Sequence, residues 1–420
     1  MSSPLLRNSQ RSLETPTVTF CRLLPGFLSR LLFFVKGPSL IYYGYNKYKD
    51  KPFRILKVDA DMLVLPAKYL AEIRYLPHTR ISLLDAQFNS VCGNYTNILN
   101  DSNLPAHTVA KKLTPSLHQI VPMVIDELQH AFKIEVPECT DRWVSVNLYS
   151  MILRLINRST SRVIVGETLC RNEEWLNIEE VFVPMILARR EAEANDPEYW
   201  KPDDFMQWMM DTADNEYDEK PENIAQGLMI IWLWLWCTLH YAHHPGYLRS
   251  SGPPRDGWSN ATQACFNAQC LLDSFLRESQ RFTLPVKSIT FSDGFTIPAK
   301  THICFPSGPL SRDPNNLPYP NLDPSTFDGF RWCRDPYGRN NKLVSTTAAN
   351  LHFGYGRQVC PGRHFAANTS KAILSRLLVE YERKFEEERE GRRPMDIRNG
   401  EQIMPNLYAK VLIRRTRDDI

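Results

Sequence analysis

The chain has 420 residues, and 43% of them are hydrophobic, which is enough for the large core of an enzyme-sized protein. Its 50 basic and 47 acidic residues leave a net charge of only +3, which argues against nucleic acid as a partner. Ten cysteines are scattered without a Cys-x-x-Cys pair or a zinc-ligand spacing, so a reducing, cytosol-facing compartment fits best.

Residues 1–45 are predicted to form an N-terminal arm in front of one large domain over residues 46–420. The stretch Phe20–Tyr45 is apolar and aromatic, but charged residues and prolines interrupt it. A membrane-spanning helix needs about 20 mostly apolar residues, and no such segment is present. The stretch therefore either lies in the interface of a membrane or packs as an arm on the protein surface.

The next segments alternate strand and helix patterns. Two strands around an Asp-rich turn are predicted over Lys47–Leu56 and Met62–Pro66, with a helical pattern from Ala67 onward. Thr114 is predicted as the N-cap of a helix that has Pro115 at its first position.

An amphipathic helix is predicted over Val144–Val165, and the polar, acidic residues 195–223 are predicted as a loop that leads into a helix. That next helix covers Ile224–His240, and its length corresponds to roughly 25 Å. Thr238 and His240 are the groups in it that could move protons, but an ordinary polar pair at a helix end is the simpler interpretation.

Residues 271–282 are predicted to form a helix on which Glu278 and Arg281 share a face, as a surface ion pair would. A hairpin with a Ser292–Gly294 turn is predicted over Phe291–Lys300. The chain closes with a predicted turn and strand over residues 403–413.

The most informative stretch is His352–Ala366. Gly354, Gly356 and Gly362 permit backbone conformations that other residues resist. Cys360 comes just before a helix predicted from Arg363 to about Lys384, and a helix N-terminus favours a thiolate. A thiolate in a tight loop can be an axial ligand of haem iron. The alternative is a buried cysteine in a Gly-rich turn, which the flanking Phe-x-x-Gly and Pro-Gly pattern disfavours.

This loop, Phe-Gly-Tyr-Gly-Arg-x-x-Cys-Pro-Gly-Arg over residues 353–363, resembles the haem-binding signature of cytochrome P450 monooxygenases of the filamentous-fungal type. The resemblance implies a mainly α fold with small β-sheets (α+β), the cytochrome P450 fold, with a haem-thiolate catalytic domain over residues 46–420. It also implies a shortened or disrupted central helix above the haem. The run over residues 224–245 lacks the family's triplet of a small residue, an acid and a threonine.

The resemblance also implies the cofactor and its binding residues. Cys360 would be the axial ligand of the iron in haem (iron protoporphyrin IX). Gln358 stands where the family usually carries Arg or His, and Arg357 beside it is a second donor for a propionate. Lys112 is the implied propionate ligand outside the loop, although Lys111, His107 or a merely solvated basic turn are alternatives. The further cofactor-binding residues implied in the loop are Phe353, Gly356 and Gly362.

Glu278 and Arg281 match the family's Glu-x-x-Arg pair, which lies behind the haem and is joined by an arginine from a later loop. That third residue is Arg331, in the segment Phe327–Trp332. The resemblance implies that these three residues support the haem site structurally and take no part in catalysis.

The implied function is a haem-dependent monooxygenase that hydroxylates or epoxidises a small apolar intermediate of fungal secondary metabolism, such as a mycotoxin precursor with a terpenoid, polyketide or indole-derived scaffold. Its electrons would come from NADPH through NADPH–cytochrome P450 reductase, at the cytosolic face of the endoplasmic-reticulum membrane. Three alternatives stay open. They are a haem-binding relative without turnover, a relative that uses peroxide or isomerises its substrate, and a helical scaffold without haem.

Overall fold

The computed structural model describes eleven stretches and four short pieces of the chain. They are residues 15–21, 23–57, 61–76, 80, 102–172, 182–228, 289–299, 301–318, 323–324, 328, 331–332, 342–385, 397–399, 402–404 and 406–416. Within these residues the chain divides into two compact units, each with its own core. The first consists of Met1–Asp101, Asp273–Cys360 and Asp396–Met404, and the second of Ser102–Leu272, Pro361–Met395 and Pro405–Ile420.

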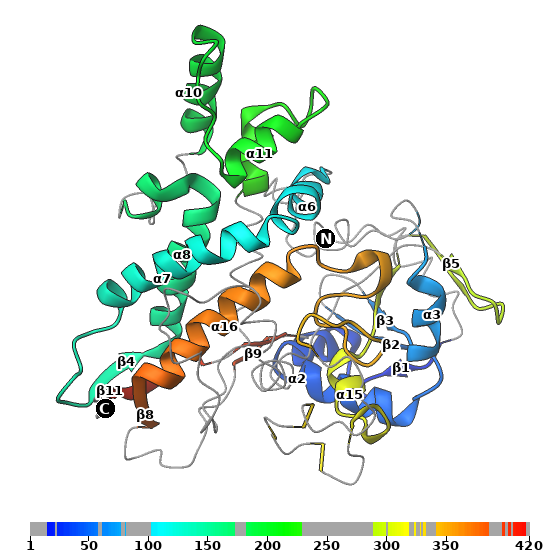
Figure 1. The fold of residues 1–420 in the computed structure, drawn as a ribbon. Helices are drawn as coiled ribbons and strands as arrows, with labels where there is room; N and C mark the ends of the chain where they lie inside the picture. The colour runs from blue at the N-terminus through cyan, green and yellow to red at the C-terminus, as the bar shows by residue number, and fades with distance from the viewer. Residues whose placement is uncertain are drawn as a thin grey trace. The chain divides into compact units, whose positions relative to one another are not determined.

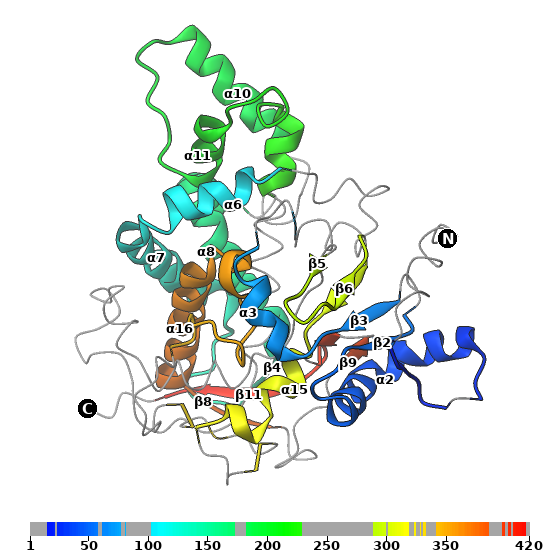
Figure 2. The ribbon, with the colours of Figure 1, turned by 90° about the vertical axis from the view of Figure 1, so that its right-hand side faces the viewer.

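The first unit is built on a four-stranded sheet beside a long helix (Figures 1 and 2). The strand order is β1-β2-β3-β7, with β2 antiparallel to β3 and the two outer pairs parallel. Phe33 and Leu40 of the helix α2 share a buried cluster with Ile55 and Val64 of the sheet. These elements are β1 (Thr17–Val18), α2 (Gly26–Lys47), β2 (Phe53–Ile55), β3 (Met62–Val64) and β7 (His302–Cys304).

The other elements of the first unit are short. The hairpin β5–β6 is antiparallel, as is the pair β9–β10. The remaining elements are η1 (Ala67–Tyr69), α3 (Leu70–Ile73), β5 (Ile289–Thr290), β6 (Thr296–Ile297), α15 (Ser307–Ser311), η4 (Pro314–Asn316), η5 (Gly356–Gln358), β9 (Ile397–Asn399) and β10 (Gln402–Met404).

The second unit is mainly helical, and α7, α8 and α16 lie side by side in it (Figure 1). A three-stranded antiparallel sheet, in the order β4-β11-β8, completes the unit. Its elements are α6 (Leu104–Thr108), the π-helical turn η2 (Val109–Leu113), α7 (Leu117–Glu135), β4 (Val144–Asn147), α8 (Leu148–Cys170), α10 (Phe182–Asn195), α11 (Phe205–Thr212), α16 (Arg363–Glu380), β8 (Tyr381–Phe385) and β11 (Lys410–Arg415).

Several predicted elements are confirmed. The antiparallel pair β2–β3, the helical start at Ala67, the hairpin around Ser292–Gly294 and the closing strand are all present. The mainly α architecture with small sheets is also as predicted. The strand predicted from Lys47 begins only at Phe53, because α2 continues through Lys47.

Four further predicted boundaries were wrong. Residues 144–147 form a strand that pairs with β11, and the helix begins only at Leu148, where the Asn147 side chain accepts from Ser150 N. The helix after Cys360 ends at Glu380, since Tyr381–Phe385 pairs with β11 as well. In both places strand pairing overrides a helical pattern.

The two other errors concern helix starts. Thr114 has helical backbone angles at the end of η2, and α7 begins at Leu117 after Ser116, so Thr114 is no N-cap. The acidic stretch predicted as a loop contains the helix α11, which Asp204 caps by accepting from Gln207 N at 2.9 Å. Residues 221–228 are helical, and the rest of the predicted helix over residues 224–240 lies outside the described residues.

Candidate functional site

The loop before Cys360 is a closed turn within the first unit. The backbone N–H of Cys360 donates to the carbonyl oxygen of Phe353 at 2.7 Å, and Gly354 N donates to Leu351 O at 2.9 Å. Phe353 is buried, which fixes the start of the loop in the core. The backbone of residues 353–360 therefore forms a defined loop that holds the cysteine at its end.

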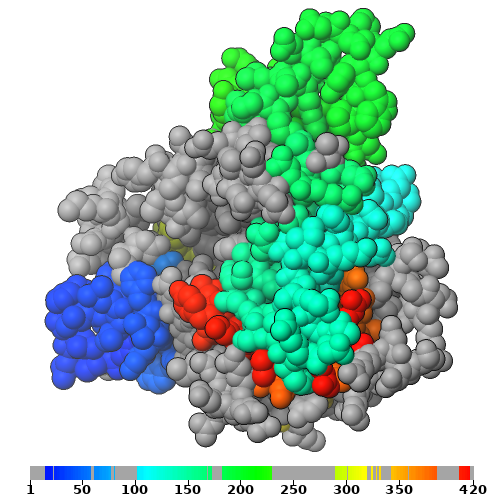
Figure 3. All heavy atoms as spheres, turned by 90° about the vertical axis from the view of Figure 1, so that its left-hand side faces the viewer, coloured from blue at the N-terminus to red at the C-terminus, as the bar shows by residue number. Residues whose placement is uncertain are grey.

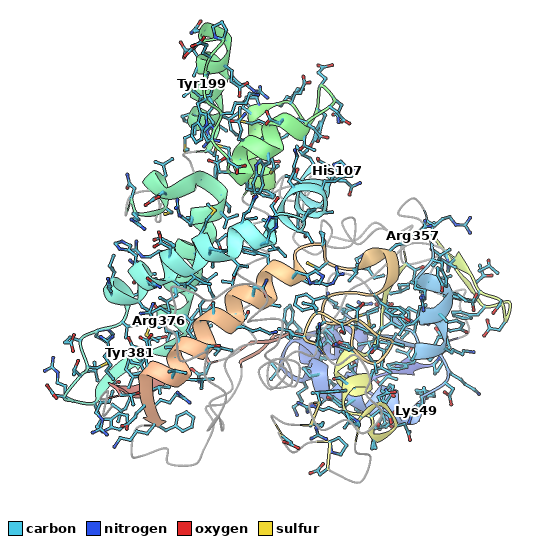
Figure 4. All side chains as sticks on the ribbon, in the orientation of Figure 1. Lys49, His107, Tyr199, Arg357, Arg376 and Tyr381 are labelled. Carbon is cyan, nitrogen blue, oxygen red and sulfur yellow. The ribbon has the colours of Figure 1, made fainter. Side chains whose placement is uncertain are left out.

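At Gly356 this loop closely approaches the backbone of Arg74. The φ of Gly356, 62°, lies in the left-handed region, and an added Cβ would come within 2.4 Å of the carbonyl oxygen of Arg74. The next residue, Arg357, donates its backbone N–H to that same oxygen at 3.1 Å. Figure 4 labels Arg357 on the short turn η5. Only glycine fits at this position.

Cys360 differs in accessibility from the three buried cysteines that the structure describes. It is partly exposed and not in a disulfide, whereas Cys139, Cys170 and Cys304 are buried. Burial, together with the neighbouring Glu127 carboxylate, raises the pKa of the Cys170 thiol to about 12. Burial also raises the pKa of Cys139. A metal ligand must be a reachable thiolate, so the donor set of this loop fits a haem-thiolate site.

The segment after the cysteine leads into the helix α16. Pro361 and Gly362 lead into α16, and the first helical bond runs from Ala366 N to Gly362 O at 3.0 Å. The Thr114 hydroxyl donates to the carbonyl oxygen of Pro361 at 3.0 Å, within the second unit. The sequence held no signal for this contact, because the two residues are far apart in the chain.

Arg331 is the one member of the predicted support triad that the structure describes. It is fully buried, its Nη2 donates to Asp323 O at 3.4 Å, and its backbone N–H donates to Asp328 O at 3.1 Å. A fully buried arginine belongs in a hydrogen-bonded support network. Glu278 and Arg281 lie outside the described residues, so the triad stays a prediction.

The other predicted site residues are placed as follows. Lys112 is exposed on η2 in the second unit, and Lys111 and His107 are exposed near it (His107 is labelled in Figure 4). The role of Lys112 as a propionate ligand stays a prediction. The backbone of Gln358 belongs to η5, and its side chain is outside the described part, as are Thr238 and His240.

Comparisons with known proteins agree with this site. The family model described as "Cytochrome P450" matches residues 256–411, which include the cysteine loop. Cytochrome P450 monooxygenase penP of Penicillium crustosum is 37% identical over 476 aligned residues, covering 96% of this chain and 90% of penP. Cytochrome P450 monooxygenase AtmP of Aspergillus flavus is 37% identical over 482 residues, covering 98% and 91%.

The fold is shared with solved structures of the same family. The cytochrome P450DA heme domain matches with a TM-score of 0.65 at 14% identity, over 96% of this chain and 97% of that one. A retinoic acid-bound cyanobacterial CYP120A1 matches with a TM-score of 0.65 at 13% identity. The chain therefore belongs to the cytochrome P450 family, has the cytochrome P450 fold and is an enzyme of that family.

One difference from these relatives is visible in the alignments. The alignment with penP runs over 476 positions, whereas this chain has only 420 residues. Since the aligned positions outnumber the residues, penP carries internal residues that this chain lacks.

Proposed function

We propose that this protein is a haem-dependent monooxygenase that hydroxylates or epoxidises a small apolar intermediate of fungal secondary metabolism, such as a terpenoid. The observation that carries the proposal is the closed loop that ends in the partly exposed Cys360, in a chain that matches fungal cytochrome P450 monooxygenases over nearly its full length. Bound haem supplies the activation of dioxygen and the transfer of one oxygen atom to the substrate.

The residues of this chain hold and orient that group. The Cys360 thiolate would bind the haem iron, and the hydrogen bond from the Cys360 backbone N–H to Phe353 O holds this end of the loop in place. Gly356 lets the loop pass close to Arg74, and Arg357 and Gln358 would donate to the propionates. The buried Arg331 would support the loop structurally together with Glu278 and Arg281, as the family motif implies, and α16 begins directly after Gly362.

The test of this proposal is the spectrum of the reduced protein with carbon monoxide. We expect the red-shifted Soret band of thiolate ligation in the wild type and its loss in Cys360→Ala. Cys21→Ala, which removes an exposed cysteine outside the loop, is the matched control and should keep the band. A colourless wild type, or an unchanged band in Cys360→Ala, would refute the proposal.

Electron supply and membrane contact complete the proposal. NADPH supplies electrons through a cytochrome P450 reductase, and the enzyme acts at the cytosolic face of the endoplasmic-reticulum membrane. Among the described residues, no helix has both the length and the apolar character needed to cross a bilayer. The helix α2, however, has an exposed apolar face formed by Phe27, Leu31, Phe34 and Val35, spaced to share one side.

That face is distinct from the side of α2 that packs into the core. The buried residues Phe33 and Leu40 lie on a different side of the helix from Phe27 and Leu31. Figure 3 shows part of this N-terminal segment, in blue, at the surface. If α2 lies in the plane of the membrane, its exposed apolar side contacts the lipid while its buried side packs into the protein core.

Vesicle flotation tests this membrane role. Replacing Phe27 and Leu31 by Ser should release the protein from phospholipid vesicles, because the apolar area that binds the lipid is lost. Leu187→Ser and Trp200→Ser change exposed apolar residues elsewhere and should leave flotation unaltered. Equal flotation of all variants would contradict the role of α2.

A second candidate function is a haem protein without monooxygenase turnover, or one that uses peroxide or isomerises its substrate. It is favoured by the internal residues that penP has and this chain lacks, and by the missing oxygen-activating triplet in residues 224–245. Sequencing the transcript across codons 224–245 tests whether the short segment is real. NADPH consumption with a reductase supports the first function, and peroxide-driven turnover without a reductase supports the second.

A further inference from the structure

Arg74 touches the turn before Cys360 with both its backbone and its side chain. It follows the last residue of α3, and its N–H donates to Leu70 O at 3.0 Å, so the helix fixes its position. Its carbonyl oxygen accepts from Arg357 N at 3.1 Å. Its backbone lies so close to Gly356 that a Cβ there would meet it at 2.4 to 2.6 Å.

The side chain of Arg74 reaches the same turn one residue earlier. Its Nη1 donates to the Tyr355 hydroxyl at 3.1 Å, and its guanidinium carbon lies 5.3 Å from the centre of the Tyr355 ring. The guanidinium also lies 4.6 Å from the centre of the Tyr75 ring. A planar guanidinium can donate a hydrogen bond and stack on aromatic faces, which an ammonium on a lysine does less well.

Among the residues that the structure describes, no carboxylate forms an ion pair with the Arg74 guanidinium. Its side-chain contacts there are with Tyr355 of the cysteine loop and with Tyr75. Tyr355 packs against the same buried cluster as Ile73 of α3 and Leu351 at the start of the loop. Three consecutive loop residues, Tyr355, Gly356 and Arg357, thus contact Arg74, the residue directly after α3. Only two residues, 358 and 359, separate Arg357 from Cys360.

We propose that Arg74 is a positioning residue for the thiolate ligand: it fixes the turn at residues 355–357 and through that turn holds Cys360 in the geometry that keeps the sulfur bound to iron. This inference rests on the proposed haem-thiolate function. It adds a residue from outside the cysteine loop that controls ligation without touching the reacting atoms.

The experiment compares four purified holoenzymes: wild type, Arg74→Gln, Tyr355→Phe and the double variant. The first readout is hydrogen–deuterium exchange of the peptide over residues 353–360. Arg74→Gln should speed this exchange about fivefold, the amount that corresponds to one lost hydrogen bond. Tyr355→Phe removes only the hydroxyl acceptor and should give a smaller change, and the double variant should not exceed Arg74→Gln because both changes break the same contact.

The second readout is the spectrum of the reduced protein with carbon monoxide. Its thiolate band would stay unchanged if Arg74 only stabilised the fold. Arg74→Gln should convert part of the red-shifted band into the blue-shifted band that marks loss of the thiolate. Arg74→Lys, which keeps the charge and can still donate, should recover part of the red-shifted band. Arg312→Gln removes another arginine that stacks on a tyrosine, Tyr42 at 5.7 Å, and should leave both readouts at the wild-type level.

Two results would overturn the role of Arg74. One is exchange of residues 353–360 at the wild-type rate in Arg74→Gln. The other is faster exchange with an unchanged thiolate band, which would mean that the turn does not govern ligation. A wild type without any thiolate band is a different failure, since it refutes the proposed function and this inference together.

Discussion

At the scale of single residues, Glu135 shows how this enzyme keeps charge inside its helical unit. It ends α7, is almost fully buried, and binds two arginines of α8, Arg154 and Arg158. Arg158 is itself buried, and its Nε lies 2.6 Å from Glu135 Oε1. A buried ion pair gains little over an apolar pair, but loss of one partner is costly because the other charge stays buried.

Glu135→Gln should therefore destabilise the protein by about 3 kcal/mol, because Arg158 keeps its buried charge and loses a carboxylate partner. Urea unfolding followed by far-UV circular dichroism measures this change. Glu167→Gln breaks the pair with Arg162 at 2.9 Å, but the Glu167 side chain is 58% exposed. That control should change stability by less than about 1 kcal/mol, and equal losses in the two variants would contradict the argument.

At the scale of elements, the turn of the hairpin β5–β6 (Figure 2) forms hydrogen bonds with side chains of α3 and η1. Glu72 accepts from both the backbone N–H and the hydroxyl of Ser292 at 2.8 Å. Asp293 accepts from Lys68 at 2.8 Å and from the Tyr69 hydroxyl at 2.9 Å. The donors from Lys68, from the Phe295 N–H and from Tyr69 lower the pKa of Asp293 to about 2.

This pKa predicts how the hairpin responds to acid. A carboxyl whose pKa is lower in the folded state stabilises that state above its unfolded pKa of about 4, and the contribution is lost as the pH falls to about 2. Asp293→Asn should therefore lower the urea midpoint at about pH 7 and do so less at about pH 3.

The same change made in a Lys68→Met background tests the cause. Because Lys68 is the largest contributor to the lowered pKa, Asp293→Asn should cost less in that background at neutral pH. A midpoint difference between wild type and Asp293→Asn that stays constant from neutral to acid pH would rule out this linkage.

At the scale of the whole molecule, the two units have separate hydrophobic cores. Leu155 lies in the core of the second unit and Leu65 in that of the first, and neither is exposed. Leu155→Ala and Leu65→Ala should each destabilise by about 3 kcal/mol, because each leaves a cavity. Hydrogen exchange should rise mainly in peptides of the unit that carries the substitution. Equal acceleration in both units by both variants would instead mean one cooperative core.

The sequence predicted local features of this enzyme better than distant ones. The Gly-rich turn, the cysteine before a helix and the Ser292–Gly294 hairpin were all readable, because each depends on residues close together in the chain. Residues 144–147 and 381–385 were misjudged as helix, because their strand state depends on pairing with β11. Near Arg376 and Tyr381, labelled in Figure 4, α16 gives way to that strand.

The contacts around the cysteine loop show the same limit. Thr114 was assigned to a helix cap, yet its hydroxyl binds Pro361, and no local pattern could have paired them. Arg74 had no predicted role, because its contacts to Tyr355 and Arg357 join segments far apart in sequence. The Glu278 and Arg281 assignments rest on the family motif alone and stay predictions.

The close approach of Gly356 to the Arg74 backbone has a practical meaning for anyone who wishes to redesign this enzyme. A mutant library that randomises the cysteine loop while keeping α3 constant will discard most of its members at position 356, because any side chain there meets a rigid helix end. Laboratory evolution of the loop should therefore keep glycine at position 356 and vary the other loop positions, because no substitution at residue 74 removes the backbone atoms that a side chain would meet.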